Sequence, residues 1–141
     1  MSTTPQVRVL CVDDNEHVAQ AVELLIARNS GFCWLGWLST ADDLVDHVQR
    51  LRPDIVLLDL DVPGLDPLVA ASRLSDAQFS TKVVVFSGHV RKDCIDRAID
   101  AGVWGYASKN DDESKLLELL SSVMAGNVEF SQEVRDVLKL A

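Results

Sequence analysis

Two short apolar runs of this chain end in acidic residues. Asp13 and Asp14 follow the run Val7 to Val12, and Asp59 follows the run Ile55 to Leu58. Such runs are typical of buried strands, and the carboxyl ends of parallel strands meet at one edge of a sheet. Crowded carboxylates repel one another, so we expect a hard divalent cation bound through oxygen, and Mg²⁺ fits this ligand set. A metal beside a free carboxylate indicates phosphoryl chemistry.

Ser87, Gly88 and Lys109 also lie just after apolar runs, so they are expected at the same sheet edge. Asp59 would be the nucleophile that forms an acyl phosphate, because a carboxylate needs positioning and charge neutralisation more than it needs a base. Lys109 would supply positive charge. Ser87 offers a hydroxyl donor, and Gly88 lets a backbone N–H approach the same phosphoryl group.

The elements that must position these residues follow from periodicity. Strand-like runs alternate with segments of helical length, which predicts an α/β fold with a parallel sheet covered on both faces. Five strands are expected at Val7–Val12, Phe32–Leu38, Ile55–Leu58, Val83–Phe86 and Trp104–Ala107.

Apolar residues at helical spacing predict the helices between and after these strands. The marking positions are Val18, Val22, Leu25 and Ile26; Leu44, Val45, Val48 and Leu51; Ile95, Ala98 and Ile99; and Leu116, Leu117, Leu120, Val123 and Met124. A third helix is expected from Pro67, followed by a polar loop over residues 75–81. After residue 130, Ser131 as a cap and the apolar Val134 and Val137 predict a short helix or a linker.

The composition of the chain limits which binding partners and which cellular compartment are expected. The 141 residues fit one domain, and 13 basic against 22 acidic residues give a net charge of −9, which disfavours direct binding of nucleic acid or of anionic membranes. Cys11, Cys33 and Cys94 form no CxxC pair and are expected as reduced thiols, which predicts a cytoplasmic location. No apolar run approaches the ~18 residues that a membrane span needs.

Four segments resemble the motifs of response regulator receiver domains, and the resemblance spans residues 7 to 126. They are Val12-Asp13-Asp14, Leu57-Leu58-Asp59 with Pro63-Gly64, Phe86-Ser87-Gly88, and Gly105-Tyr106-Ala107-Ser108-Lys109. The resemblance implies a flavodoxin-like three-layer sandwich with five parallel strands in the order 2-1-3-4-5. It also implies a signalling domain rather than an enzyme with an external substrate.

The same resemblance implies a role for each site residue. Asp59 would accept a phosphoryl group from a phosphohistidine on a sensor histidine kinase or a histidine phosphotransfer protein. Asp14 and Asp59 would bind Mg²⁺ directly, Asp13 would act largely through water, and the backbone carbonyl of Asp61 would complete the protein ligands. Lys109 would pair with the phosphate.

Ser87 and Tyr106 match the family's switch pair, in which the hydroxyl moves toward the phosphate and the aromatic ring turns toward the vacated space. The segment after residue 126 is similar to the linker of NarL/FixJ-type regulators. Residues 1–126 are therefore expected to form the receiver and residues 127–141 a linker-like tail without an effector domain. Phosphorylation is expected to change partners or to promote a homodimer.

Two departures from the family pattern suggest control of hydrolysis. Asp61 is an extra carboxylate two residues after Asp59, and His89 lies two residues after Ser87. We expect these side chains to set the hydrolysis rate by positioning or excluding water. Asp66-Pro67 replaces an Asp-Gly that is common in the family, and it leaves the start of the third helix open.

Two other function classes compete with this interpretation. Asp59-Leu60-Asp61-Val62 resembles the DxDxV signature of haloacid dehalogenase-type phosphatases, in which the second Asp is a general acid and base. The acidic pair upstream and the lack of a cap segment disfavour it. A phosphorylation-independent interaction module is the other alternative. A P-loop nucleotidase is disfavoured because no GxxxxGK motif is present.

Overall fold

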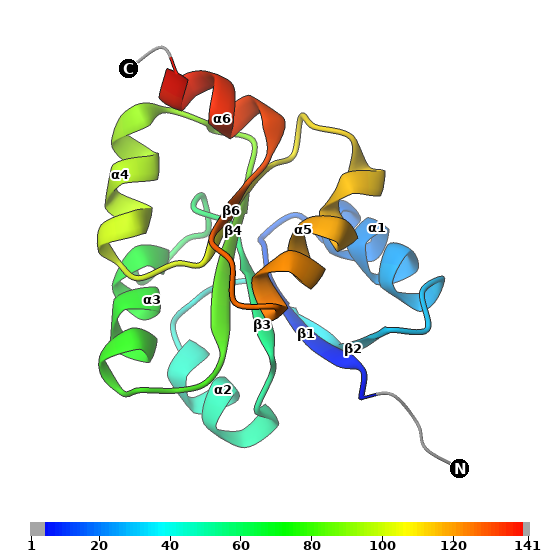
Figure 1. The fold of residues 1–141 in the computed structure, drawn as a ribbon. Helices are drawn as coiled ribbons and strands as arrows, with labels where there is room; N and C mark the ends of the chain where they lie inside the picture. The colour runs from blue at the N-terminus through cyan, green and yellow to red at the C-terminus, as the bar shows by residue number, and fades with distance from the viewer. Residues whose placement is uncertain (1–4, 140–141) are drawn as a thin grey trace.

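The computed structural model describes residues 5–139, which form one parallel sheet with helices on both faces (Figure 1). The strand order is β2-β1-β3-β4-β5-β6. The strands are β1 (Val7–Val12), β2 (Phe32–Leu38), β3 (Ile55–Leu58), β4 (Lys82–Ser87), β5 (Gly105–Ser108) and β6 (Glu129–Phe130). Every neighbouring pair is parallel, as the alternation of strands and helices predicts.

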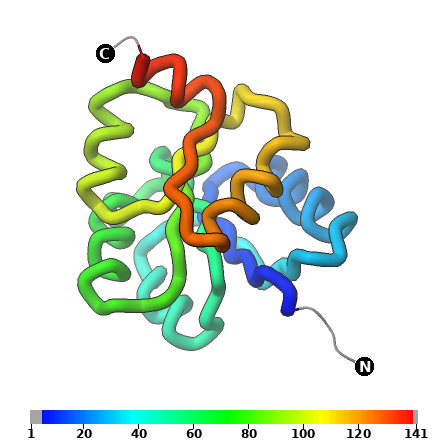
Figure 2. The backbone as a smooth tube through the Cα atoms, in the orientation of Figure 1, coloured from blue at the N-terminus to red at the C-terminus, as the bar shows by residue number. Residues whose placement is uncertain are grey.

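The helices form two outer layers. They are α1 (Glu16–Ala27), α2 (Leu44–Leu51), α3 (Pro67–Asp76), α4 (Lys92–Asp100), α5 (Leu116–Met124) and α6 (Gln132–Lys139), with a short 3₁₀ turn at Glu113–Lys115 before α5. Figure 2 shows α1 and α5 on one side of the sheet and α2, α3 and α4 on the other. Each side has its own apolar core, because the side chains of a strand point alternately to the two faces.

The strand count predicted from the sequence is wrong by one. The predicted order 2-1-3-4-5 is confirmed for the first five strands, and β6 extends the sheet beyond β5 through the pairs Gly105↔Glu129 and Tyr106↔Phe130. A strand of two residues has no periodicity that the sequence could reveal. The C-terminal helix after residue 130 is confirmed as α6.

Two helices differ in detail from the predictions. Asp66-Pro67 starts α3: the Asp66 carboxylate accepts a hydrogen bond of 2.9 Å from the Leu68 N–H, and Pro67 occupies the first helical turn. The helix continues to Asp76, two residues into the segment predicted as loop. Ile99 of α4, predicted to face the core, is 47% exposed.

The C-terminal segment packs onto the domain instead of leaving it. Val134 of α6 is fully buried, and Val137, Leu138 and Phe130 pack against the core cluster beneath α2, α3 and α4. Figure 1 shows α6 lying at the end of α4, above β6. Within residues 5–139, no helix combines the length and the apolar character that crossing a membrane requires.

Candidate functional site

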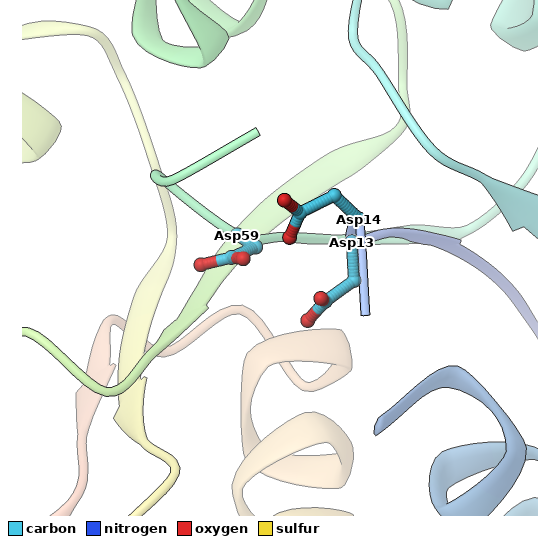
Figure 3. Close-up of side chains that lie close together, drawn as sticks. All are labelled: Asp13, Asp14 and Asp59. Carbon is cyan, nitrogen blue, oxygen red and sulfur yellow. The ribbon is translucent and has the colours of Figure 1, made fainter. Parts of the chain in front are cut away.

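The predicted site residues meet at the carboxyl edge of the sheet. The Asp13 N–H donates to the carbonyl of Leu38 at 3.0 Å, and the Asp59 N–H donates to the carbonyl of Val12 at 2.9 Å. These bonds continue the strand ladders by one residue and fix where each carboxylate starts. Asp13, Asp14 and Asp59 therefore gather beyond the ends of β1 and β3, with carboxylate oxygens within 4.8 Å of one another (Figure 3).

Lys109 joins this cluster from the end of β5. Its ammonium lies 2.7 Å from Asp13 Oδ2 and 3.4 Å from Asp59 Oδ2. The side chains of Asp13 and Asp59 are 2% and 5% exposed, and that of Lys109 is 21% exposed. Charge pairs with so little access to water interact much more strongly than surface pairs. Lys109 therefore holds two buried carboxylates together.

The pKa shifts describe a site short of positive charge. Burial raises the pKa of Asp59, the nearby ammonium of Lys109 lowers it, and the carboxylate of Asp13 raises it again, so that the pKa lies above its ordinary value. Burial lowers the pKa of Lys109, but its contacts with Asp13 and Asp59 outweigh burial and leave that pKa raised. The ionised form of Asp59 is thus less favourable than that of a carboxylate in water, and an additional cation bound nearby would stabilise it.

The donor set fits a hard divalent cation. Two buried carboxylates and the exposed Asp14 face one another, and all three offer oxygen, the ligand that Mg²⁺ prefers. Mg²⁺ usually keeps several waters beside one or two carboxylates, so the exposed side of Asp14 leaves room for those waters. The main-chain N–H of Asp61 donates to Asp59 Oδ1 at 3.4 Å, which places Asp61 directly beside the cluster.

Ser87 and Tyr106 are connected through the main chain of His89. The His89 N–H donates to Ser87 Oγ at 3.0 Å, and the Tyr106 hydroxyl donates to the His89 carbonyl at 2.7 Å. Tyr106 is fully buried, and this burial raises the pKa of its phenol, so the hydroxyl stays a neutral donor. The two residues of the predicted switch pair therefore bond to the two peptide units on either side of the His89 Cα. Gly88 lies between Ser87 and His89 in the sequence, and the space where its Cβ would lie is open.

The two departures from the family pattern face each other at the mouth of the site. His89 Nε2 lies 3.1 Å from Asp61 Oδ2, and both side chains are more than half exposed. The pair connects the loop after β3 with the loop after β4. Asp61 therefore has a histidine of this chain as its partner.

Two contacts at the site were not foreseen from the sequence. The indole Nε1–H of Trp37, at the end of β2, donates to the main-chain carbonyl of Asp13. Residues of the C-terminal segment bond to the residues on either side of Lys109. An aromatic residue at a strand end was the only signal for the first contact, and no local pattern indicates the second.

Comparison with known proteins agrees with this geometry. Residues 9–121 match the family model described as the response regulator receiver domain. The chain is 28% identical over 138 residues to the nitrate/nitrite response regulator protein NarL of Escherichia coli K12, covering 98% of this chain and 64% of NarL. It is 28% identical over 134 residues to the response regulator GacA of Pseudomonas aeruginosa, covering 95% and 63%. The chain thus spans less than two thirds of these curated relatives.

Solved structures show the same fold. A LuxR-family two-component response regulator from Aurantimonas sp. SI85-9A1 superposes with a TM-score of 0.88 at 24% identity, covering 95% of this chain and 96% of that one. The signal receiver domain of a NarL from Mycobacterium tuberculosis gives a TM-score of 0.83 at 20% identity, covering 88% and 100%. Because the family model covers most of the chain, this protein belongs to the response regulator receiver domain family of two-component signalling.

Proposed function

We propose that Asp59 accepts a phosphoryl group from a phosphohistidine on a sensor histidine kinase or a histidine phosphotransfer protein. A carboxylate oxygen of Asp59 attacks phosphorus, the bond between phosphorus and the histidine nitrogen breaks, and the imidazole leaves with its electron pair. The product is an acyl phosphate on Asp59. The observation that carries the proposal is the position of this buried carboxylate between Lys109 and the acidic pair.

Charge neutralisation would be the main catalytic contribution of the site, because phosphoryl transfer needs positioning and electrostatic stabilisation more than covalent chemistry. Lys109 is within reach of the oxygens that a phosphoryl group on Asp59 would carry. Asp13, Asp14, Asp59 and the backbone carbonyl of Asp61 would hold Mg²⁺. When bound, Mg²⁺ supplies the positive charge that lets an anionic donor approach this acidic edge.

Ser87 and Lys109 would then stabilise the phosphorylated state. Ser87 Oγ now accepts a hydrogen bond from His89, so its own proton is free to be donated to a phosphoryl oxygen. Rotation of Ser87 toward the phosphate would release the N–H of His89, the residue whose carbonyl Tyr106 holds. This shared residue gives the switch a physical basis: the main chain of His89 responds to both side chains.

The proposed output depends on what the native chain carries beyond this receiver. The full-length relatives NarL and GacA are response regulators, so we propose transcriptional control if a helix-turn-helix domain is joined to this segment, and control of a protein partner otherwise. Formation of a homodimer on phosphorylation belongs to the same proposal. With a net charge of −9, the segment itself is not expected to bind nucleic acid.

The decisive experiment is intact-mass analysis after incubation with acetyl phosphate and Mg²⁺. The wild type should gain the mass of one phosphoryl group, and Asp59→Asn should gain none. Asp46→Asn, which removes an exposed carboxylate from α2, serves as the matched control and should label like the wild type. Labelling of Asp59→Asn, or steady turnover of p-nitrophenyl phosphate by the wild type, would contradict the proposal and favour the phosphatase.

A further inference from the structure

The residues that flank Lys109 are bonded to the C-terminal segment. Glu133 Oε1 accepts hydrogen bonds from Ser108 Oγ at 3.0 Å and from Asn110 Nδ2 at 3.2 Å. Ser131 Oγ accepts from the Ser108 N–H at 2.9 Å. The phosphate-pairing lysine therefore lies between two residues that are both tied to residues 131–133.

The C-terminal segment also donates hydrogen bonds of its own to the end of β5 and to the loop that follows it. The Ser131 N–H donates to the carbonyl of Tyr106 at 3.1 Å, and the Glu133 N–H donates to Asp111 Oδ2 at 3.0 Å. Asp111 thus satisfies a free N–H in the first turn of α6 from a loop 22 residues away. Val134, in the next position, is fully buried. The C-terminal segment is therefore held at the end of β5 both by hydrogen bonds and by a buried apolar side chain.

We infer that Glu133 is a positioning residue that acts through the main chain around Lys109, and that it latches α6 to the unphosphorylated state. This inference rests on the function proposed above. A carboxylate that accepts from two donors makes stronger hydrogen bonds than a neutral group does. Glu133 therefore restrains Ser108 and Asn110, and with them the main chain that carries the lysine.

Sheet order determines the direction of the coupling. β5 lies between β4 and β6, so Asp59 at the end of β3 is on one side of Lys109 and the C-terminal segment is on the other. The Lys109 N–H donates to the Ser87 carbonyl at 2.9 Å, which ties the two phosphate-contacting residues together. Drawing both toward a phosphoryl group on Asp59 pulls the end of β5 away from Glu133. Phosphorylation therefore weakens the latch.

Thermodynamic linkage makes this coupling reciprocal. If a phosphoryl mimic on Asp59 weakens the docking of α6, then weakening that docking must tighten binding of the mimic by the same factor. Because reciprocity holds for binding equilibria, the affinity for the mimic is the quantity to measure. Fluoroberyllate is a suitable probe, since it has been used as a phosphomimetic with the receiver domain of RcsB.

The experiment titrates fluoroberyllate into the complete chain at saturating Mg²⁺ and follows amide signals by NMR. Glu133→Gln is expected to bind the mimic about 3- to 10-fold more tightly than the wild type, because a neutral amide oxygen accepts more weakly than a carboxylate from both donors. Ser108→Ala removes the hydroxyl that donates to Glu133, and it should also increase the affinity for the mimic. In the wild type, the amides of Ser131 and Glu133 should exchange with solvent several-fold faster once the mimic is bound.

Asp136→Asn is the matched control. It removes one negative charge from the same helix, but Asp136 Oδ1 accepts only from Gln132 Nε2 among the hydrogen bonds of the described residues. It should bind the mimic like the wild type, which separates the latch from a general change in charge. Equal or weaker affinity in both Glu133→Gln and Ser108→Ala, or unchanged exchange at residues 131 and 133, would overturn the inference. A wild type that binds no fluoroberyllate would instead contradict the proposed function itself.

Discussion

Lys109 and Asp13 form an ion pair of 2.7 Å in which the carboxylate is 2% exposed. The ammonium lies closer to Asp13 than to Asp59, which is 3.4 Å away. The proposed nucleophile is therefore the less neutralised of the two buried carboxylates, and this agrees with its raised pKa. Four features of the site and one of the core lead to measurable consequences.

Asp59→Asn should stabilise the protein in the absence of Mg²⁺. Since the folded-state pKa of Asp59 is raised, the stability that this carboxyl contributes is fully present below its unfolded pKa and is lost as pH rises through the folded pKa. At neutral pH the variant should gain on the order of 1 kcal/mol in urea unfolding. The gain should shrink as pH falls and when Mg²⁺ is added. An equal gain at pH 7 with and without Mg²⁺ would contradict a metal bound at this carboxylate.

Ser87 and Tyr106 should be energetically coupled, because both bond to the main chain of His89. Tyr106→Phe alone should lower the free energy of unfolding by about 1 kcal/mol, the usual net value of one hydrogen bond. A double-mutant cycle with Ser87→Ala should give a coupling energy of at least about 0.5 kcal/mol. Additive effects would mean that the two residues are not coupled through the main chain of His89.

Trp37→Phe should weaken Mg²⁺ binding. The indole N–H holds the carbonyl of Asp13, and this carbonyl belongs to the peptide unit that leads into Asp14. Loss of one hydrogen bond should raise the dissociation constant measured by calorimetry about 3- to 10-fold. Trp34→Phe, on the same strand but packed in the core cluster, is the control. Equal weakening in both variants would point to a loosened β2 instead.

Asp61→Asn and His89→Ala should shorten the lifetime of the acyl phosphate. Their 3.1 Å contact spans the loops at the mouth of the site, so removing either partner should admit water to the phosphorus. Hydrolysis is expected to accelerate roughly threefold or more, measured by loss of the phosphorylated mass after removal of acetyl phosphate. Lys92→Ala, which breaks an exposed pair on α4, should leave the lifetime unchanged. An unaltered lifetime in both site variants would reject this role.

Cys11 should make stability fall at alkaline pH. Burial raises the pKa of its thiol from 9.0 to about 12, and the thiol is 1% exposed. The stability that the neutral thiol contributes is fully present below the pKa of Cys11 in the unfolded chain. This stability is lost as pH rises toward the pKa in the folded protein, at up to about 1.4 kcal/mol per pH unit. Urea unfolding between about pH 8 and pH 11 should show a shallower decline for Cys11→Ala than for the wild type. If the free energy of unfolding falls equally with pH in both proteins, Cys11 does not cause the alkaline loss of stability.

The acidic cluster was predictable because it depends on local patterns. Apolar runs locate the strands, the residue after each run lies at the sheet edge, and the chemistry of Asp13, Asp14 and Asp59 follows from their side chains. The helices were found for the same reason, since a buried stripe has the period of the helix itself. Ile99 shows the limit of this argument, because an apolar residue on a helix can face the solvent at no great cost.

The sequence by itself thus determined the strand order of the first five strands and the gathering of the proposed nucleophile Asp59 with Asp13, Asp14 and Lys109, through the resemblance and the positions of strand ends. Only the tertiary structure decided that Trp37 orients Asp13, that His89 connects Ser87 with Tyr106, and that Glu133 binds both neighbours of Lys109. These contacts join segments that are distant along the chain or depend on main-chain atoms. No side-chain periodicity encodes them, so they emerge only when the sheet brings the segments together.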